Sequence, residues 1–477
     1  MLDALQELTQ AVPDSAYAEA RWVRTRREAI RVRAGRLDGI EDEESEGVGV
    51  RVLHGGGFGF AATRDLSRAG LAAALARARA IAAEGREPAA LAPLPESARG
   101  HWAGPCERDP FAAGIEQKIE LLVAAEGAMR GDARIVSTEA SCLALAEDWA
   151  FASSEGAAAT QSFVQCGGGL QAIAVQDGEL QVRSYPSAHG GSVAAAGLEH
   201  LDGLALVEQA PRVAEEVVAL LTAPPCPSGR STLVLGSEQL ALQIHESIGH
   251  ALELDRVQLG EAAYAGTSWV NPADIGSLRY GSAHLNITAD ATLSGALGSF
   301  GWDDEGVAAT RTPLIVGGEL RAALSDRVSA ARAGLARSAG CARADGFARQ
   351  PIVRMTNVSI EPGEAGGVAE LIAGVDEGVF MESNRSWSID DRRLHFQFGT
   401  EVAYEIRGGE LGRLLRNPSY AGVTPELWGS LEAVAGPGEW RLWGVLNCGK
   451  GQPGQVAHVS HGAAPARFRD VQIGVAR

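Results

Sequence analysis

The spacing of apolar residues along this chain alternates between two patterns. Apolar residues three or four positions apart predict amphipathic helices, whereas alternating apolar and polar residues predict strands with one buried face. The helical pattern of the first half covers residues 1–12, Leu66–Gly85, Glu116–Gly131 and Leu204–Ala223. A kink or break is expected in the last of these helices, at Pro211. Alternating stretches within residues 17–63 and 133–183 predict antiparallel strands joined by glycine turns.

The second half begins at PPCPSG (Pro224–Gly229), where a proline-rich break separates a helix from a strand. The next predicted helix starts after Gly236, with Ser237 as its expected N-cap, and beyond Leu254 strands and turns dominate. Because strands and helices do not alternate as βαβ units, the pattern favours an α+β fold. We expect two domains. The first is an N-terminal antiparallel sheet with flanking helices (1–223). After a linker (224–230), the second is a strand-rich, barrel- or sandwich-like domain (231–477) that carries the helix from Ser237.

Charge and composition exclude several classes of function. The 477 residues carry a formal net charge of −18, which disfavours binding to nucleic acids or anionic membranes. No apolar run is long enough to span a membrane. The N-terminal residues lack the basic and apolar segments of a secretory signal, so we expect a cytoplasmic protein. The six cysteines are scattered, without a CxxC pair, and are expected to be reduced.

The stretch LALQIHESIGHALEL (Leu240–Leu254) holds the main candidate chemistry. Two imidazoles, His245 and His250, and the carboxylate of Glu246 are residues of the types that bind a divalent metal and supply a general base. On a regular helix, five residues advance the chain by about 140° beyond a full turn, so the two imidazoles would point apart. A shared metal therefore requires a one-residue bulge or a break near Gly249, and π-bulges do occur at functional sites. The alternative is an ordinary packed helix with two buried histidines.

A third ligand has to come from elsewhere in the chain, and Cys448 is the candidate. It lies in VLNCGKGQPGQ, where glycines let a thiol approach a site closely and Lys450 offers a positive charge that favours the thiolate. A turn cysteine without function is the alternative. His458 and His461 follow closely and are competing ligands. Weaker candidates for other roles at the site are His395, Tyr404, Arg354, Arg393 and the acidic stretch Asp303–Glu305.

Taken together, these motifs resemble those of the TldD/PmbA metalloproteases, once described as modulators of DNA gyrase. The resemblance rests on HESIGH (His245–His250), SFGWDDEGV (Ser299–Val307), VRMTNVSIEPG (Val353–Gly363) and NCGKGQ (Asn447–Gln452). GVGVRVLHGGGFGFAAT (Gly47–Thr63) is also similar to the N-terminal hairpin of that family. The PmbA branch, also called TldE, lacks the metal motif, so the chain is identified as a member of the TldD branch.

The resemblance implies a zinc ion held by His245, His250 and Cys448, with Glu246 as the general base that works on a zinc-activated water. It implies peptides or unfolded polypeptides as substrates. It also implies a dimer, either a heterodimer with a TldE/PmbA-type subunit or a homodimer.

Two other functions compete with a zinc peptidase. The first is a non-catalytic peptide-binding or regulatory subunit that contains structural zinc, in which a fourth protein ligand such as His458 or His461 would close the site. The second is an exopeptidase of the dipeptidyl-peptidase III kind, which shares the His-Glu-x-x-x-His spacing but takes a carboxylate as its third ligand. Glu246 argues against the first alternative, because a structural site needs no base, and Cys448 argues against the second.

Overall fold

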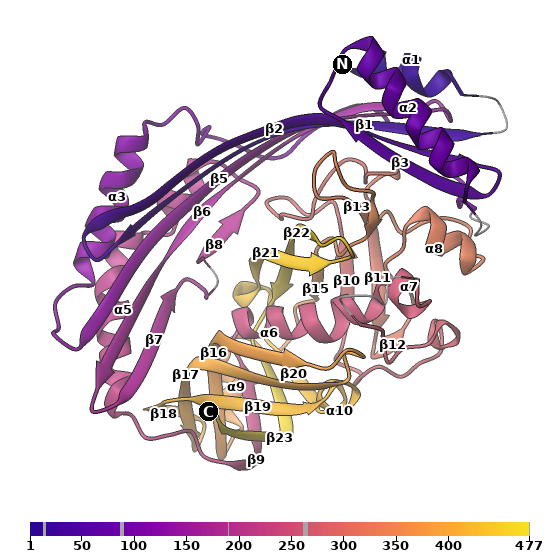
Figure 1. The fold of residues 1–477 in the computed structure, drawn as a ribbon. Coiled ribbons are helices and arrows are strands. Elements are labelled where there is room, and N and C mark those ends of the chain that lie inside the picture. The colour runs from indigo at the N-terminus through magenta and orange to yellow at the C-terminus, as the bar shows by residue number, and fades with distance from the viewer. Residues whose placement is uncertain (13–15, 86–89, 189, 261–265, 477) are drawn as a thin grey trace.

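The computed structural model describes residues 1–12, 16–85, 90–188, 190–260 and 266–476. The first half of the chain forms one large, arched sheet, and the second half lies within the curve of the arch (Figure 1). The sheet contains β1 (Tyr17–Arg33), β2 (Arg36–His54), β3 (Gly57–Thr63), β4 (Arg99–Ala103), β5 (Ile135–Ser153), β6 (Ala158–Gln176), β7 (Glu179–Tyr185) and β8 (Ser192–Ala194). Its order is β3-β2-β1-β5-β6-β4, with β7 and β8 also paired to β6, and every pairing except β4–β6 is antiparallel.

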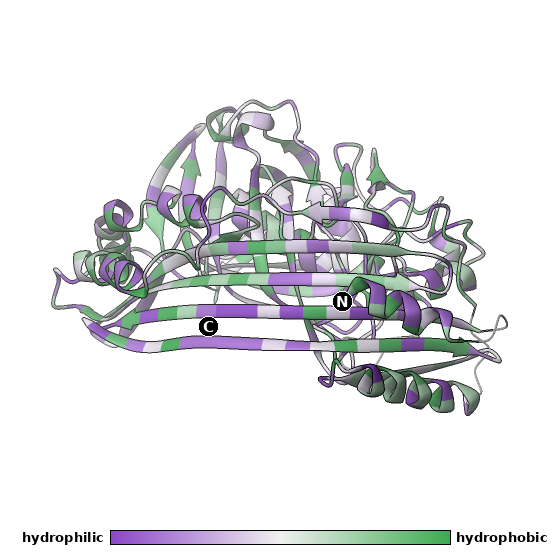
Figure 2. Ribbon diagram, turned by 90° about the horizontal axis from the view of Figure 1, so that it is seen from above, coloured by the Kyte–Doolittle hydropathy of each residue, from purple (hydrophilic) through white to green (hydrophobic). Residues whose placement is uncertain are grey.

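Helices cover the convex face of this sheet. They are α1 (Leu2–Gln10), α2 (Arg68–Ala83), α3 (Ile115–Ala128), α4 (Leu198–Gly203) and α5 (Leu206–Thr222). Side chains alternate between the two faces of a strand, and on β1 the even-numbered Ala18, Ala20, Ile30 and Val32 are buried in the two helix-covered cores. The odd-numbered positions face the second half of the chain. Seen from above, the long strands have hydrophilic middle sections, and their apolar residues gather toward the ends (Figure 2).

The second half is built around a closed five-stranded barrel. Its strands are β9 (Gly229–Leu235), β16 (Glu377–Ile389), β17 (His395–Arg407), β19 (Pro418–Val423) and β23 (Ala466–Val475). Pairing runs β9–β23–β19–β17–β16 and returns to β9, which closes the ring. Strands β18 (Glu410–Leu415) and β20 (Leu431–Val434) pair with β17 and β23 outside this ring.

Smaller sheets and short helices complete the second half of the chain. A four-stranded sheet contains β10 (Ile287–Asp290), β11 (Arg311–Val316), β12 (Glu319–Leu320) and β15 (Val358–Ile360). Two-stranded sheets are formed by β13 (Ala342–Arg343) with β14 (Ile352–Val353), and by β21 (Arg441–Lys450) with β22 (Gln455–Ala463). The helices are α6 (Ser237–Ile244), α7 (Leu254–Val257), α8 (Arg327–Arg332), α9 (Val368–Ala373) and α10 (Thr424–Gly429), with short 3-10 turns η3 (Pro272–Asp274) and η4 (Pro437–Glu439).

The predicted α+β class is confirmed: an N-terminal antiparallel sheet with helices is followed by a barrel-containing half. Two local expectations were wrong. Helix α5 is not broken at Pro211 but runs through it, so that of the two alternatives only the kink stays a prediction. Ser237 is not the N-cap of α6, because Gly236 occupies that position. The Ser237 hydroxyl instead accepts a hydrogen bond from the Trp443 indole, at 3.1 Å. None of the described helices is long and apolar enough to cross a membrane.

The two halves are joined by buried polar contacts. Arg51 of β2 forms ion pairs with Glu19 of β1, at 2.8 Å, and with Glu305 of the second half, at 2.6 Å, and all three side chains are buried. Breaking a buried pair leaves an uncompensated charge and costs several kcal/mol, so these contacts hold the arch against the second half. The acidic stretch Asp303–Glu305, a weaker sequence candidate for a role at the site, is part of this joint.

Candidate metal centre

The helix that carries the two histidines changes its winding at the first of them. Helix α6 ends at Ile244 and continues as a π-helix, η1 (His245–Gly249), and then as a 3-10 turn, η2 (His250–Leu252). The backbone N–H of His250 donates to the carbonyl of His245, the i to i+5 bond of a π-helical turn. This extra residue in the turn removes the angular mismatch of the five-residue spacing. The irregularity predicted near Gly249 is therefore confirmed.

Buried neighbours hold the π-helical turn in place. A Cβ atom on Gly249 would lie 2.1 Å from the sulfur of Met355, which is fully buried, so only glycine fits there. The Ser247 hydroxyl donates to the Gln243 carbonyl at 2.6 Å, and its backbone carbonyl accepts from the Tyr280 hydroxyl at 2.5 Å. Trp428 also donates its indole N–H to the Ser247 hydroxyl, at 3.0 Å. These bonds satisfy polar groups that the altered winding exposes inside the core.

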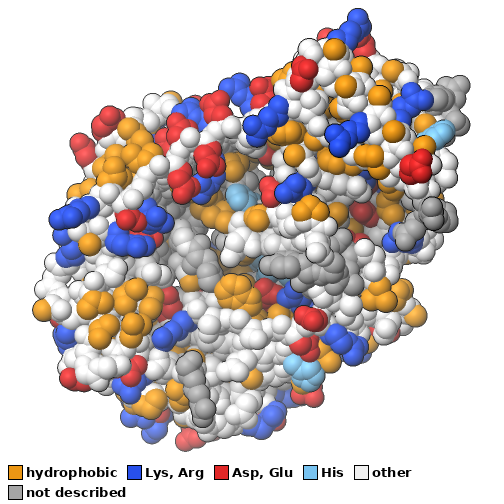
Figure 3. Space-filling view, viewed as in Figure 1, with side chains coloured by type: hydrophobic (Ala, Val, Ile, Leu, Met, Phe, Trp, Pro, Cys, Tyr) orange, Lys and Arg blue, Asp and Glu red, His pale blue; other side chains and the backbone are white. Residues whose placement is uncertain are grey.

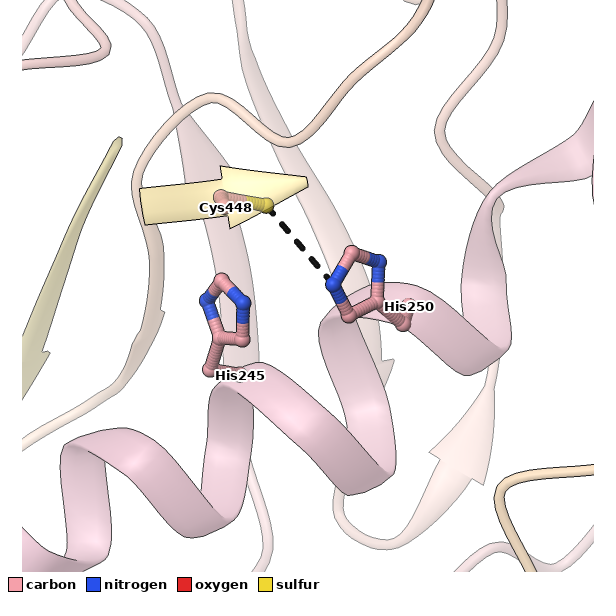
Figure 4. Close-up of side chains that lie close together, drawn as sticks. All are labelled: His245, His250 and Cys448. Carbon is pink, nitrogen blue, oxygen red and sulfur yellow. Dashed lines mark hydrogen bonds between the residues drawn. The ribbon is translucent and has the colours of Figure 1, made fainter. Parts of the chain in front are cut away.

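Three side chains meet beside this turn. His245 and His250 project from η1 and η2, and Cys448 reaches them from β21 (Figure 4). One ligand atom of each lies within 4.8 Å of the other two, and the Cys448 sulfur is 3.6 Å from Nε2 of His250. All three residues are buried. The structure thus brings together two parts of the chain that are about 200 residues apart.

A chain of hydrogen bonds sets the protonation of His245. Nδ1 of His461 lies 2.7 Å from the carbonyl oxygen of Val358, which can only accept, so this nitrogen carries the proton. Burial lowers the pKa of His461 well below its ordinary value, and in the neutral ring Nε2 is then an acceptor. It lies 2.7 Å from Nδ1 of His245, which therefore donates. Burial also lowers the pKa of His245, to about 4, so its Nε2 keeps a free lone pair.

His250 is held in the same tautomer by a carboxylate. Its Nδ1 donates to Oε2 of Glu253, at 3.0 Å, which leaves the lone pair on Nε2 facing Cys448. Burial opposes ionisation of Glu253, but Lys450, His250 and Arg256 outweigh it and hold the pKa of this carboxyl well below its usual value. Sequence reasoning missed Glu253. Its i,i+3 spacing from His250 was the available signal.

Arg354 is the cation beside the sulfur. Its guanidinium donates to the Cys448 sulfur at 3.1 Å and also to the Cys448 carbonyl. Burial raises the pKa of the Cys448 thiol, but the neighbouring His250 and Arg354 outweigh this effect, and the pKa is lower than that of an ordinary cysteine. Lys450, which the sequence suggested for this role, instead bonds Asp255, at 2.7 and 2.8 Å, and the Val353 carbonyl.

Glu246 follows His245 directly in the chain and is not one of the three donors that come together. Its carboxylate accepts a hydrogen bond from the Arg393 guanidinium at 2.5 Å, and the side chain retains slight exposure. Arg393 was a weak sequence candidate for a different role, stabilising an oxyanion. An arginine in this position orients a carboxylate through a charge-assisted hydrogen bond, which suits a base rather than a ligand.

The remaining sequence candidates lie elsewhere. Nδ1 of His458 is 2.6 Å from the side-chain oxygen of Gln165 on β6, and His458 is not among the donors that come together. His461 supports His245 from behind and does not join the donors itself. His395 begins β17 on the exposed side of the barrel, and Tyr404 lies further along the same strand, packed near Phe380.

Family models match three parts of the chain. Residues 228–475 match the model of the PmbA/TldA metallopeptidase C-terminal domain. Residues 18–82 match domain 1 of the same metallopeptidases, and residues 108–223 match their central domain. The chain belongs to the PmbA/TldD metallopeptidase family. The resemblance found in the sequence motifs is thereby confirmed.

Curated relatives carry names of the same kind. A protein of Methanothermobacter thermautotrophicus named metalloprotease is 30% identical, over 96% of this chain and 95% of its own length. A metalloprotease TldD homolog of Haemophilus influenzae is 27% identical, over 92% and 89% of the two chains. A zinc metalloprotease TldD homolog of Saccharolobus solfataricus is 26% identical, over 52% of each. These names support a metallopeptidase.

Solved structures share the fold. TldE from Thermococcus kodakarensis superposes with a TM-score of 0.72, covers 96% of both chains and is 17% identical. A Thermotoga maritima protein described as a modulator of a DNA gyrase gives a TM-score of 0.75 at 18% identity, again over 96% of both chains. Both therefore have the same overall architecture as the present chain.

Proposed function

We propose that the chain is a zinc-dependent peptidase that hydrolyses peptide bonds in unfolded or extended polypeptides. Zinc is held by His245, His250 and Cys448, and Glu246 is the general base. The observation that carries the proposal is the meeting of two imidazoles and a thiol, with ligand atoms within 4.8 Å, beside a carboxylate that is not one of them. The relatives named metalloproteases support the reaction class.

The donor set fits zinc. Tetrahedral zinc with bond lengths of 2.0–2.3 Å places a sulfur and a nitrogen ligand about 3.5 Å apart. The Cys448 sulfur and Nε2 of His250 are 3.6 Å apart. Both histidines use Nδ1 for hydrogen bonds to fixed acceptors, and acceptors behind the ring orient imidazoles that bind metal. Sulfur and imidazole ligands together favour zinc over magnesium or calcium.

When bound, zinc supplies Lewis acidity that polarises the scissile carbonyl and acidifies a water molecule. The residues of the chain do the proton work. Glu246 accepts the proton of the attacking water and passes it to the leaving amine, because its carboxylate is the acceptor next to the metal donors. Arg393 keeps this carboxylate in place through its 2.5 Å hydrogen bond. Arg354 favours the thiolate form of Cys448, which is the form that binds metal.

The number of available ligands favours catalytic over structural zinc. A closed site needs a fourth protein ligand. Among the described residues, His461 uses both ring nitrogens, for His245 and for the Val358 carbonyl, and His458 bonds Gln165 instead. The carboxylate expected in a site of the dipeptidyl-peptidase III kind is also missing from the described cluster, since Glu253 holds the far side of His250. A position for water is thus left open.

An extended peptide substrate, a dimer partner and two domains complete the proposed organisation. Strand edges near the site can align an extended peptide by main-chain hydrogen bonds, with little sequence selectivity. Because a structural neighbour is named TldE, we include dimerisation with a TldE-type subunit or with a second copy of the chain. The division into domains 1–223 and 231–477, joined by 224–230, stays a prediction.

Zinc content and peptidase activity, measured together, test the proposal. Glu246→Gln is expected to keep one zinc per chain and to lose peptidase activity at least a hundredfold. Cys448→Ser is expected to lose zinc as well, whereas Cys341→Ser, which changes another buried cysteine, keeps both properties. Full zinc in Cys448→Ser, or full turnover of an unfolded substrate by Glu246→Gln, would refute the assignment.

A further inference from the structure

A large cavity lies between the arch and the second half of the chain. Its volume is about 970 Å³. The space-filling view shows the molecule hollowed in this region (Figure 3). One wall is the concave face of β1, β2, β5 and β6, and the other includes residues 297–304, 343–349 and 456–458. The three metal donors do not line it, but Leu446 and His458 do, and they belong to the same β21–β22 hairpin as Cys448 and His461.

Glu147 of β5 lies on the arch side of this cavity. Alternate residues of β5, from Leu143 to Trp149, line the cavity, so Glu147 points into it. Its neighbour Asp148 is exposed and is not among the lining residues. Adjacent positions of one strand thus place one carboxylate inside the cavity and one on the opposite face.

The charges around Glu147 do not neutralise it. Arg21 is committed to Asp304, at 3.3 Å, and to the carbonyls of Gly346 and Arg349. Arg343 donates to the carbonyls of Met355 and His458, at 3.1 and 2.8 Å. Within the part of the chain that the structure describes, no hydrogen bond or ion pair is made by the Glu147 carboxylate.

The surroundings of Glu147 penalise its negative charge. Burial is the largest effect, and together with the negative charges of Asp304 and Asp345 it raises the pKa of Glu147 to about 7. Arg21 and Arg343 act in the opposite direction but do not cancel it. An incoming cation would relieve this penalty. The lining also includes four aromatic side chains, Trp149, Phe163, Trp302 and Phe347, which give an apolar wall suited to the aliphatic stem of a long basic side chain.

We infer that this cavity binds a lysine or arginine side chain of an extended peptide, with Glu147 as the residue that recognises its charge. The inference rests on the proposed function, because it gives that peptidase a preference for basic segments. The β21–β22 hairpin connects the cavity to the metal donors, so a peptide held by Glu147 runs along the strand that carries Cys448. A chain with a net charge of −18 also attracts basic peptides at long range.

A binding measurement tests the inference independently of hydrolysis. Two fluorescein-labelled ten-residue peptides have the same sequence of uncharged residues except at one central position, which is lysine in one and uncharged acetyl-lysine in the other. Each is titrated with the full chain carrying Glu246→Gln, which prevents turnover. Anisotropy is read at pH 8, where Glu147 is ionised, and in 0.15 M salt, which screens long-range attraction. Glu147→Gln is then added to this chain, and Asp148→Asn is its matched control on the same strand.

The lysine peptide is expected to bind at least tenfold more tightly than the acetyl-lysine peptide. Glu147→Gln should bring the two affinities within twofold, and Asp148→Asn should leave their ratio unchanged. Equal binding of both peptides, no binding of either, or a ratio that survives Glu147→Gln would overturn the inference. A lysine preference in the Glu246→Gln chain, together with no peptide hydrolysis by the unsubstituted chain, would instead refute the proposed function alone.

Discussion

Replacing Gly249 with alanine tests whether the π-helical turn is what places the two histidines. The added Cβ would lie 2.1 Å from the Met355 sulfur and 3.2 Å from its terminal methyl. An ordinary contact between such atoms is about 3.5–4.0 Å, so one of them has to move by roughly 1.5 Å. Met355 is fully buried, and its sulfur lies in the middle of the side chain, so the thioether cannot simply swing into solvent.

Overpacking of this kind costs about 1–3 kcal/mol in the free energy of unfolding. The helix can also relax by rewinding to regular α-helical geometry. This change removes the bulge and turns His245 and His250 apart. We therefore expect Gly249→Ala to lose stability and also to weaken zinc binding by at least tenfold, since loss of ligand alignment is felt directly in metal affinity.

Urea unfolding and zinc competition against a chelator measure the two effects. Gly429→Ala is the matched control, because Gly429 is also helical and its added Cβ would meet nothing within 4 Å. It should be neutral or slightly stabilising, as alanine is in helices. Met355→Ala opens the space that the new methyl needs, so the double variant should regain zinc relative to Gly249→Ala. Unchanged zinc affinity in Gly249→Ala, or no recovery in the double variant, would refute the reasoning.

Two further predictions concern groups behind the donors, His461 and Glu253, and a third concerns His458, which bonds Gln165. His461→Phe keeps a ring but removes the acceptor for His245, and should weaken zinc binding 10- to 100-fold while circular dichroism stays native. Glu253→Gln removes the buried negative charge that faces Arg256 and Lys450 and should lower the free energy of unfolding by about 3 kcal/mol, whereas Glu410→Gln, on the surface, should not. The pKa of His458 is lowered to about 4 by burial and by Arg343, so the folded protein binds fewer protons than the unfolded chain between pH 4 and 6.5. The free energy of unfolding is therefore highest above pH 6.5 and decreases as the pH falls below that value. His458→Gln should therefore remove about 1.4 kcal/mol of the stability loss between pH 7.5 and 5.5, and equal slopes in both proteins would contradict this.

The sequence was informative wherever a pattern is local. The five-residue spacing of His245 and His250 predicted an irregular helix, because regular geometry makes a shared metal impossible at that spacing. Alternation of apolar residues predicted the long strands of the arch, and glycines marked many of their turns. Such inferences depend only on the geometry of one element.

Contacts between distant segments were beyond this reasoning. The sequence suggested His461 as a competing ligand. In the fold it lies behind His245 as a hydrogen-bond acceptor, although the two residues are 216 positions apart in sequence. The sequence suggested Lys450 as the cation beside Cys448, but Arg354 has that position, because the choice depends on how β14 and β21 pack together. The acidic stretch 303–305 was a weak candidate for a role at the site, but it helps to join the two halves, since Glu305 pairs with Arg51 and Asp304 accepts from Trp149 of the arch.

The candidate centre depends on two one-residue irregularities that act together. The π-helical turn adds a residue between the histidines, and β21 adds one between Val445 and Cys448, where the pairing with β22 shifts. Side chains alternate along a strand, so an extra residue turns the side chains after it to the other face. Without it, Cys448 would share the face of Leu446, which lines the cavity. A regular helix and a regular hairpin would thus direct His250 and Cys448 away from each other, and the one extra residue in each element is what makes a common metal position available.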